Sequence, residues 1–182
     1  SRLILPTLAG IVAAFRAAGL PVIYTRYVAA PNYRLLQGRL PWLKLLESPV
    51  HSCVPGHLRQ FEDRDMPLDA AEVVDELAPQ PGEMVIDKIF FSAFHQTDLD
   101  ARLRGAGIDG LAITGTLTEM CVEDTARHAV HCGYPTALIS DVVASNVAED
   151  HTATLRTFAK NYGWVMDSQA LHAALADHAK PC

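Results

Sequence analysis

Hydrophobic positions along the chain change repeatedly between a helical and a strand spacing. Residues 3–18 place apolar side chains on one helical face, and Gly19 ends this pattern. The β-branched run at 21–25 is typical of a buried strand. From residue 83 onward the pattern predicts strands at 83–87, 111–114, 135–140 and 163–166 and helices at 98–104, 118–132, 151–162 and 168–178. This order predicts βαβ units and a mostly parallel sheet, hence a single α/β domain over residues 1–182.

The segment 26–65 has no sustained period and contains several prolines. We expect it to leave the sheet as a long excursion with one short helix at 40–46. Long irregular segments in compact domains are usually binding loops or lids. Aromatic and arginine side chains are also enriched at interfaces. Four side chains of this segment suit either a lid over a pocket or, as we favour, an oligomer contact: Tyr33, Arg34, Arg39 and Trp42.

Composition narrows the functional classes. The 182 residues are 49% hydrophobic and 20% charged, which predicts a folded globular domain. The formal net charge of −6 argues against a nucleic-acid partner, because phosphate binding needs clustered Lys and Arg. No apolar run reaches the roughly 18–20 residues that span a bilayer, and Pro6 and Arg16 interrupt the most apolar opening stretch. We expect a small-molecule substrate, and neither a nucleic-acid nor a membrane partner.

Four cysteines are scattered along the chain without a Cys-x-x-Cys pair. This arrangement does not resemble a disulfide framework and favours a reducing, cytoplasmic location. The strand–turn–helix setting of a catalytic cysteine is absent at Cys53, Cys132 and Cys182, so we do not expect these three to be catalytic.

Cys121 differs from these three in its setting. It follows the strand at 111–114 through a tight turn that leads into a helix, and active crevices of parallel sheets lie at such strand ends. Thr116 and Glu119 fit a capping box, which would put Cys121 in the first or second helical turn. There the helix dipole and unpaired N–H groups favour a thiolate and can hold an oxyanion. The alternative is that Cys121 is only a small residue of the buried core.

Lys88 follows the strand at 83–87 and precedes an apolar run. An ammonium held against these side chains would need a counter-charge. The alternative is an ordinary surface lysine. Phe91 and Phe94 are candidates for lining a substrate pocket, although core packing would explain either one.

Several motifs resemble the isochorismatase-like cysteine hydrolases, which include nicotinamidases, N-carbamoylsarcosine amidases, biuret hydrolases and ureidoacrylate amidohydrolases. The resemblance runs from about Leu3 to Leu175 and implies a three-layer αβα sandwich with a Rossmann-like sheet. It is carried by Asp87-Lys-Ile-Phe-Phe-Ser-Ala-Phe94, by Thr97-Asp-Leu-Asp100, by residues 113–127, by Gly133-Tyr134 and by Ile139-Ser-Asp141.

The resemblance also implies a mechanism. It assigns Cys121 as the nucleophile of an Asp–Lys–Cys triad, Lys88 as the cation, and ammonia or an amine as the group that leaves a thioester intermediate. It implies a cis peptide bond at Thr116–Leu117 and an oxyanion hole formed by the N–H groups of Leu117 and Cys121. Members are commonly dimers or tetramers, so we expect a homo-oligomer.

The aspartate of this triad has no counterpart in the printed sequence. Family members begin with a central strand that ends in the aspartate, whereas this sequence opens at Ser1 within the following helix. Without that strand, two rows of backbone groups would be unpaired, at roughly 1–3 kcal/mol for each buried group. We therefore expect an N-terminal piece of about 15–40 residues that carries the strand. Asp87 is no substitute, because neighbouring strand residues point to opposite faces.

The predicted lack of metal ligands is a second departure from the family pattern. Relatives that bind zinc carry an Asp and two His after the strand matched to 21–25, and residues 26–33 contain none of these. His128 and His131 are three apart on one helix without a matching third ligand, and His151 is better explained as a helix-start residue. We expect no metal and no cofactor, which favours the metal-free amidases over nicotinamidase.

The leading hypothesis is therefore a cysteine-dependent amidohydrolase that acts on a small carboxamide or ureido substrate. Isochorismate hydrolysis is an alternative, although members with that activity generally lack the cysteine. A catalytically silent binding or scaffold protein is another. A papain-like pair of Cys121 with His95 has no supporting spacing.

Overall fold

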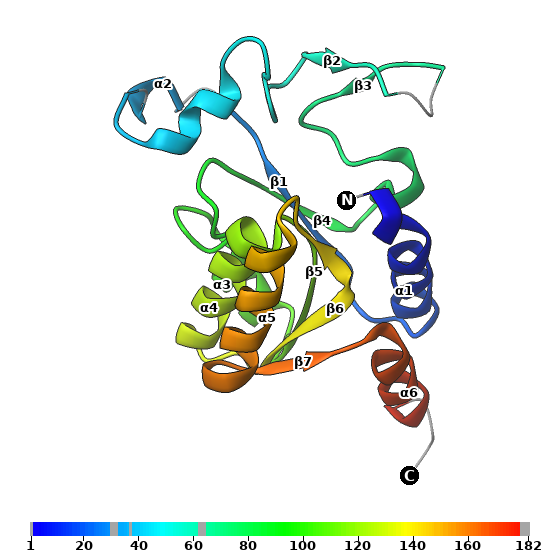
Figure 1. The fold of residues 1–182 in the computed structure, drawn as a ribbon. Coiled ribbons are helices and arrows are strands. Elements are labelled where there is room, and N and C mark those ends of the chain that lie inside the picture. The colour runs from blue at the N-terminus through cyan, green and yellow to red at the C-terminus, as the bar shows by residue number, and fades with distance from the viewer. Residues whose placement is uncertain (1, 30–32, 37, 62–64, 179–182) are drawn as a thin grey trace.

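The computed structural model describes residues 2–29, 33–36, 38–61 and 65–178. It confirms the predicted α/β class, with parallel strands between two helical layers (Figure 1). One layer contains α1 (Leu5–Ala17) and α6 (Ser168–His178). The other contains α3 (Leu99–Gly105), α4 (Glu123–His131) and α5 (Ala148–Asn161). Among the described residues, no helix is both long and apolar enough to cross a membrane.

The parallel strands form two hydrogen-bonded groups. In one group β1 (Ile23–Tyr27) pairs with β4 (Met84–Lys88), with Tyr27 opposite Lys88. In the other, β6 (Thr136–Ala144) lies between β5 (Leu111–Thr116) and β7 (Trp164–Met166). Within the described part of the chain no ladder joins β1 to β5. The edges of β1 and β5 that face each other therefore pair with no described strand.

The strand β6 shows why the pattern predicts a sheet covered on both sides. Ile139 and Val142 pack in a cluster with Leu8 and Ile11 of α1. Leu138 and Val143 pack instead in a cluster with Phe158 of α5. Such apolar burial on both faces is typical of parallel strands between helices.

The regular elements begin and end within a few residues of their predicted positions, with one correction. A π-helical turn, η4 (Thr118–Val122), precedes α4, and Leu117 rather than Thr116 occupies its N-cap position. No side-chain hydrogen bond caps this turn, so the predicted capping box is wrong. The physical reason is that Thr116 still belongs to β5, where it pairs with Ala144.

The excursion predicted at 26–65 starts later in the structure, because β1 continues to Tyr27. The name is used below for the described residues from 28 to 72, which contain more structure than the sequence predicts. The expected short helix is present as the 3₁₀ helix η2 (Pro41–Leu46). In addition there are a short helix, α2 (Tyr33–Leu36), and a two-stranded antiparallel ribbon of β2 (Leu58–Arg59) and β3 (Leu68–Asp69). Ala29, Leu43 and Leu46 form a buried cluster of their own. Two further 3₁₀ turns, η1 (Arg2–Ile4) and η3 (Asp75–Leu77), lie outside the excursion.

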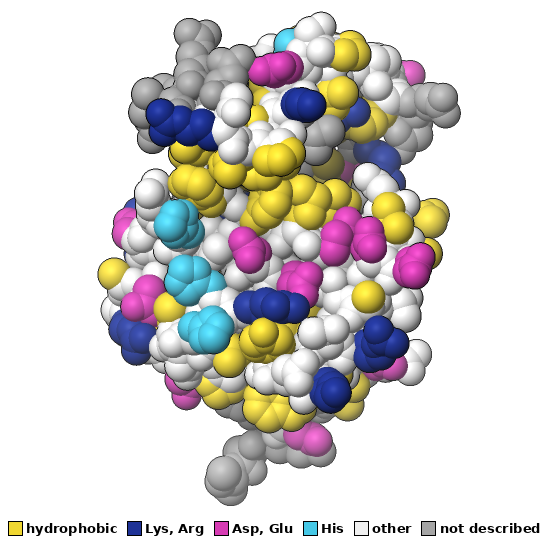
Figure 2. All heavy atoms as spheres, turned by 60° about the vertical axis from the view of Figure 1, so that its left-hand side comes forward, with side chains coloured by type: hydrophobic (Ala, Val, Ile, Leu, Met, Phe, Trp, Pro, Cys, Tyr) yellow, Lys and Arg dark blue, Asp and Glu magenta, His cyan; other side chains and the backbone are white. Residues whose placement is uncertain are grey.

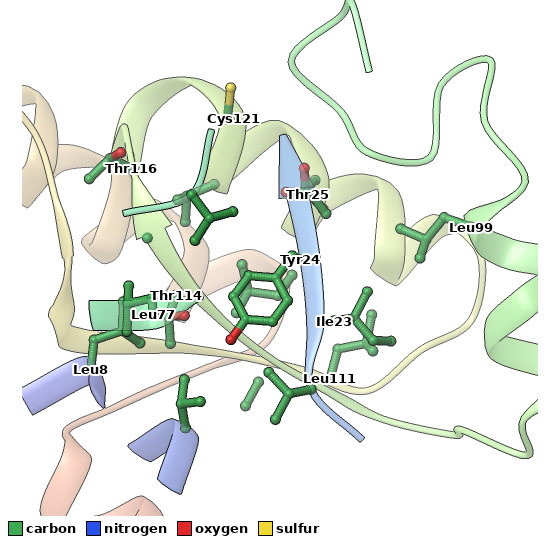
Figure 3. A pocket seen from close by; sticks show the side chains of 18 of the residues that line it. Leu8, Ile23, Tyr24, Thr25, Leu77, Leu99, Leu111, Thr114, Thr116 and Cys121 are labelled. Atoms are coloured by element: carbon green, nitrogen blue, oxygen red, sulfur yellow. The ribbon is translucent and has the colours of Figure 1, made fainter. Parts of the chain in front are cut away.

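A cavity of about 360 Å³, here called the interstrand cavity, lies between β1 and β5. Side chains of both strands line it, and Leu8, Leu77 and Leu99 contribute to its walls (Figure 3). Cys121 lies at one end, near Thr25 and Thr116, whereas Ile23 and Leu111 lie toward the other. One end of the cavity therefore lies beside the cysteine.

Candidate active site

The centre of the site is a contact between Lys88 and Cys121. Lys88 ends β4 and Cys121 lies in the turn after β5, so the parallel arrangement brings both to one edge of the sheet. The Lys88 ammonium donates to Cys121 Sγ at 3.1 Å and to the carbonyl oxygens of Phe90 and Phe91 at 3.0 and 2.7 Å. Lys88 is only 4% exposed. A buried ammonium requires such partners, and the sulfur is the one that can carry a full negative charge.

Asp87 points away from this contact, as the strand alternation predicts. Its carboxylate is exposed and accepts two hydrogen bonds from Arg26, at 2.8 and 3.0 Å. Arg26 also pairs with Glu72 at 2.5 Å. The hydrogen bond to Asp87 is the main cause that raises the pKa of Arg26. Arg26 of β1 thus joins Asp87 of β4 to Glu72 at the end of the excursion.

The turn that holds Cys121 is fixed from both sides. Thr118 is fully buried, and its hydroxyl lies 2.9 Å from His151 Nδ1 at the start of α5. The amides of Met120 and Val122 both donate to the carbonyl oxygen of Leu117. The Thr116–Leu117 peptide bond is cis. His151 thus contacts the turn that holds Cys121, in addition to lying near a helix start.

A second cavity, here called the cysteine cavity, has a volume of about 470 Å³. The sheet side of its wall includes Lys88, Phe91, Thr116, Leu117 and Cys121, all of which sequence reasoning had selected. The excursion contributes the opposite wall, with Trp42, Leu46, Ser52, Cys53, Arg59, Ala70, Ala71 and Glu72. The cavity therefore forms only where the excursion meets the strand ends.

The two phenylalanines proposed for a substrate pocket have different environments. Phe91 lines the cysteine cavity, and its ring lies 4.9 Å from that of Trp42. Phe94 is buried in a core cluster, where its ring faces His128 and Tyr134, and it lines the interstrand cavity. Core packing therefore accounts for Phe94.

Tyr27 is a wall residue that the sequence does not single out. Its ring lies 5.4 Å from the Lys88 ammonium and meets Trp42 edge-on at 5.6 Å. Its buried hydroxyl has no hydrogen-bond partner among the described residues. Burial raises the pKa of Tyr27, and negative charge at Cys121 and Cys53 raises it further. The Tyr27 ring thus adds a cation–π contact to the three hydrogen-bond partners of the ammonium.

Cys53 and Arg59 also reach the cavity without a sequence signal of their own. Cys53 has a positive φ of 57°, and its carbonyl oxygen accepts a hydrogen bond from Ala29 at 2.9 Å. Burial is the main cause that raises the pKa of its thiol. Both residues lie more than 60 positions from Cys121, so only the tertiary structure brings them to it.

Histidine side chains gather on another face, next to a band of hydrophobic side chains (Figure 2). A groove of about 650 Å³ there includes His95, His128 and His131 in its lining. His128 Nδ1 lies 2.9 Å from the Ser92 hydroxyl, and His131 faces Tyr162. The described residues contain no group of three or more His, Cys, Asp or Glu arranged to hold a metal ion. His95 lines this groove and neither cavity that contains Cys121.

The structure thus combines a parallel α/β fold with a buried cysteine–lysine contact at its strand ends. The isochorismatase domain model matches residues 2–170, and the chain belongs to the isochorismatase family. A ureidoacrylate amidohydrolase of Methylobacterium radiotolerans is 32% identical over 180 residues, which cover 94% of this chain and 67% of that protein. An uncharacterized isochorismatase family protein of Bacillus subtilis is 42% identical over 92 residues, 50% of this chain and 49% of its own length.

Solved structures agree with this assignment. A cysteine hydrolase from Pseudomonas syringae pv. phaseolicola superposes with a TM-score of 0.79 at 28% identity, covering 97% of this chain and 82% of that one. The N-carbamoylsarcosine amidase from Thermoplasma acidophilum gives a TM-score of 0.69 at 26% identity, covering 92% and 84%. The family and fold expected from the sequence motifs are confirmed.

Proposed function

We propose that this protein is a cysteine-dependent amidohydrolase that cleaves the C–N bond of a small carboxamide or ureido substrate. The observation that carries the proposal is the 3.1 Å contact between Lys88 Nζ and Cys121 Sγ in the wall of a 470 Å³ cavity. The ammonium is placed to stabilise the negative charge that the sulfur gains when its proton is removed, and the thiolate is the nucleophilic form of cysteine. Relatives named ureidoacrylate amidohydrolase and N-carbamoylsarcosine amidase support the same reaction class.

The reaction balances with one nucleophile and one carboxylate base. The carboxylate takes the thiol proton, Cys121 Sγ bonds to the carbonyl carbon, and the carbonyl oxygen becomes an oxyanion. Collapse of this intermediate breaks the C–N bond, and the carboxylic acid returns its proton to the leaving nitrogen. Water then attacks the thioester and gives a proton to the carboxylate, the C–S bond breaks to release the acyl product, and the carboxylic acid returns that proton to the sulfur. Lys88 holds the positive charge beside the sulfur throughout.

The backbone N–H groups of Leu117 and Cys121 are proposed to bind the oxyanion. Both residues line the cysteine cavity, and the helical turn directs its first amides toward the strand end. Preorganised donors at such a position stabilise the developing charge without reorganising during the reaction.

The carboxylate is proposed to lie at the Cys121 end of the interstrand cavity. An extended segment laid between β1 and β5, parallel to both, would pair their free edges and bury apolar side chains on both faces. Its carboxyl end would then lie beside Cys121, where this cavity ends (Figure 3). An aspartate at that end would reach Lys88 and Cys121 together.

Replacing the nucleophile tests the proposal. In protein expressed from the complete reading frame, Cys121→Ala and Cys121→Ser are expected to lower ammonia release by at least about 10³-fold, because the covalent route is lost. Nicotinamide, N-carbamoylsarcosine, biuret and ureidoacrylate form the substrate panel. Cys132→Ala is the control, since Cys132 lines neither cavity, and it is expected to keep activity.

Two outcomes would contradict this function. One is turnover that persists in Cys121→Ala. The other is the lack of an acyl-enzyme adduct on the Cys121 peptide after acid quenching and mass spectrometry. Isochorismate consumption without ammonia release, unchanged in Cys121→Ala, would indicate the alternative activity of the fold.

A further inference from the structure

We propose that His151 is a positioning residue for the nucleophile, because it holds the turn that carries Cys121 through the hydroxyl of Thr118. This inference rests on the proposed function, since it assigns a role in the reaction of Cys121. His151 belongs to α5 and lines neither cavity that contains the cysteine. Its effect on the reaction therefore passes through the turn and not through contact with a substrate.

The turn that carries Cys121 has few side-chain contacts that fix its shape. It is a single π-helical turn over Thr118–Val122, a rare backbone form, and no side-chain hydrogen bond caps its first residue. Among the described residues, side chains of this turn form two hydrogen bonds, Cys121 with Lys88 and Thr118 with His151. The first involves the reacting sulfur itself. The second is therefore the side-chain contact that fixes the backbone around the sulfur.

Burial makes His151 important to Thr118. The side chain of Thr118 is fully buried, and its hydroxyl lies 2.9 Å from His151 Nδ1. A buried hydroxyl that loses its partner has no solvent to replace it, so the backbone around it is expected to shift until another partner is found. His151 is itself partly exposed, and its ring can be hydrated instead. The contact thus constrains the turn more than it constrains the histidine.

Thr118 lies close along the chain to both groups that the proposed reaction uses. It directly follows Leu117, whose N–H is proposed to bind the oxyanion, and it precedes Cys121 by three residues. A shift of the Thr118 backbone therefore moves the oxyanion donors and the sulfur together, relative to Lys88. Misplacing reacting groups by about 1 Å can cost about 10²-fold in rate, so a small shift is enough to be measured.

A neighbouring contact of α5 provides a comparison. Thr154, one turn after His151, donates its hydroxyl to Glu123 Oε2 at 3.0 Å, at the start of α4. Glu123 also pairs with Arg127, so it keeps a partner when the threonine hydroxyl is removed. Thr118 has no such second partner among the described side chains. Loss of Thr154 is therefore expected to weaken the packing of α5 without moving the turn.

Removing the imidazole ring tests the proposal in protein expressed from the complete reading frame. His151→Ala is expected to lower kcat about 10- to 30-fold and to change KM less than about twofold, because the cavity is kept while the groups used in the transition state move. Iodoacetamide alkylation of Cys121, followed by peptide mass spectrometry, is expected to slow about 5- to 10-fold. This second measurement does not require turnover.

A conservative variant and a matched control separate positioning from general stability. His151→Asn is expected to retain at least about half of both rates, because its amide offers a donor and an acceptor near the place of Nδ1. Thr154→Val is expected to leave both rates within about twofold. Both His151→Ala and Thr154→Val are expected to lower the thermal midpoint by about 2–5 °C. A purely structural His151 would lower the midpoint without lowering the rates per folded molecule.

A double-mutant cycle shows whether His151 acts through Thr118. Thr118→Val replaces the hydroxyl by a methyl group of similar size, so no buried hydroxyl is left without a partner. In this background, His151→Ala is expected to slow Cys121 alkylation by less than about twofold further, against 5- to 10-fold when Thr118 is present. An equal effect of His151→Ala in both backgrounds would overturn the proposal.

The outcomes separate this proposal from the function on which it rests. If no panel compound releases ammonia and Cys121 reacts slowly with iodoacetamide in the unmodified protein, the hydrolase function fails. If the unmodified protein is active and His151→Ala lowers kcat no more than Thr154→Val does, the positioning role fails while the function stands. A change in KM alone, with kcat and the alkylation rate unchanged, would likewise overturn the positioning role.

Discussion

The sheet region and the excursion contribute to the same cavity in different ways. In the sheet region, β4 and β5 end at the same edge of the sheet, with β1 between them, and Lys88 Nζ lies 3.1 Å from Cys121 Sγ. These positions are consequences of parallel strands and a strand-to-helix turn. The excursion has no such regularity, and it contributes Trp42, Cys53 and Arg59 through a small buried cluster and a two-residue ribbon.

This difference separates reaction chemistry from substrate choice. The groups proposed to make and break bonds lie on elements whose positions the whole sheet fixes. The excursion residues of the cavity wall lie on a segment that contacts the rest of the fold through particular side chains. Trp42 packs on Phe91 and Tyr27, and Glu72 pairs with Arg26. A change in the excursion could therefore alter the ligand while the strand ends keep the same chemistry.

Removing the ammonium of the sheet region has the largest expected effect. Lys88→Met keeps the length and apolar stem of the side chain but loses its charge, and it is expected to lower kcat/KM about 10²- to 10³-fold. The thermal midpoint is expected to change little, because apolar replacements of buried charges are often tolerated. The measurement is ammonia release together with thermal unfolding.

Lys160→Met is the matched control for this change. Lys160 is an exposed residue of α5, and its replacement is expected to leave activity and stability unchanged. If Lys88→Met kept more than a tenth of the activity, the assignment of catalysis to the sheet region would be wrong.

The same comparison explains what the sequence could predict. Apolar periodicity locates the strands and helices from β4 to α6 within a few residues, and the strand-to-helix turn makes Cys121 a candidate site residue, with a buried core cysteine as the alternative. Lys88 follows from its position at a strand end. The walls of the cavity were predicted only in part, because residues such as Tyr27, Cys53 and Arg59 acquire their role through contacts between distant segments. No local period encodes such contacts.

A substitution in the sheet region is expected to change stability without changing the site. Gly163 precedes β7, and a Cβ there would lie 2.2 Å from the carbonyl oxygen of Thr136 and 2.9 Å from the buried ring of Phe158. Gly163→Ala is therefore expected to destabilise the fold by about 2–3 kcal/mol. Activity per folded molecule is expected to be retained, and urea unfolding monitored by circular dichroism gives the measurement.

Gly110→Ala provides the comparison, because Gly110 also precedes a parallel strand. A Cβ there would meet only the carbonyl oxygen of Pro135, at 3.4 Å, so the expected change is below about 1 kcal/mol. Equal destabilisation by the two substitutions would show that the close approach at Gly163 is not the cause.

The smallest expected effect is on the alkylation rate of Cys53, which shows whether the excursion stays packed on the sheet. Burial raises the pKa of the Cys53 thiol, negative charge at Cys121 raises it further, and Lys88 and Arg59 partly oppose this shift. A raised pKa means that less thiolate is present at a given pH below it. In folded protein at pH 8, Cys53 is therefore expected to react with iodoacetamide about 3- to 10-fold more slowly than in urea. Its folded-state rate is expected to continue rising at pH values where the rate in urea has levelled off. If Cys53 instead reacted equally fast in both states, the excursion would not be covering the strand ends, and the wall that contains Arg59 would not form in solution.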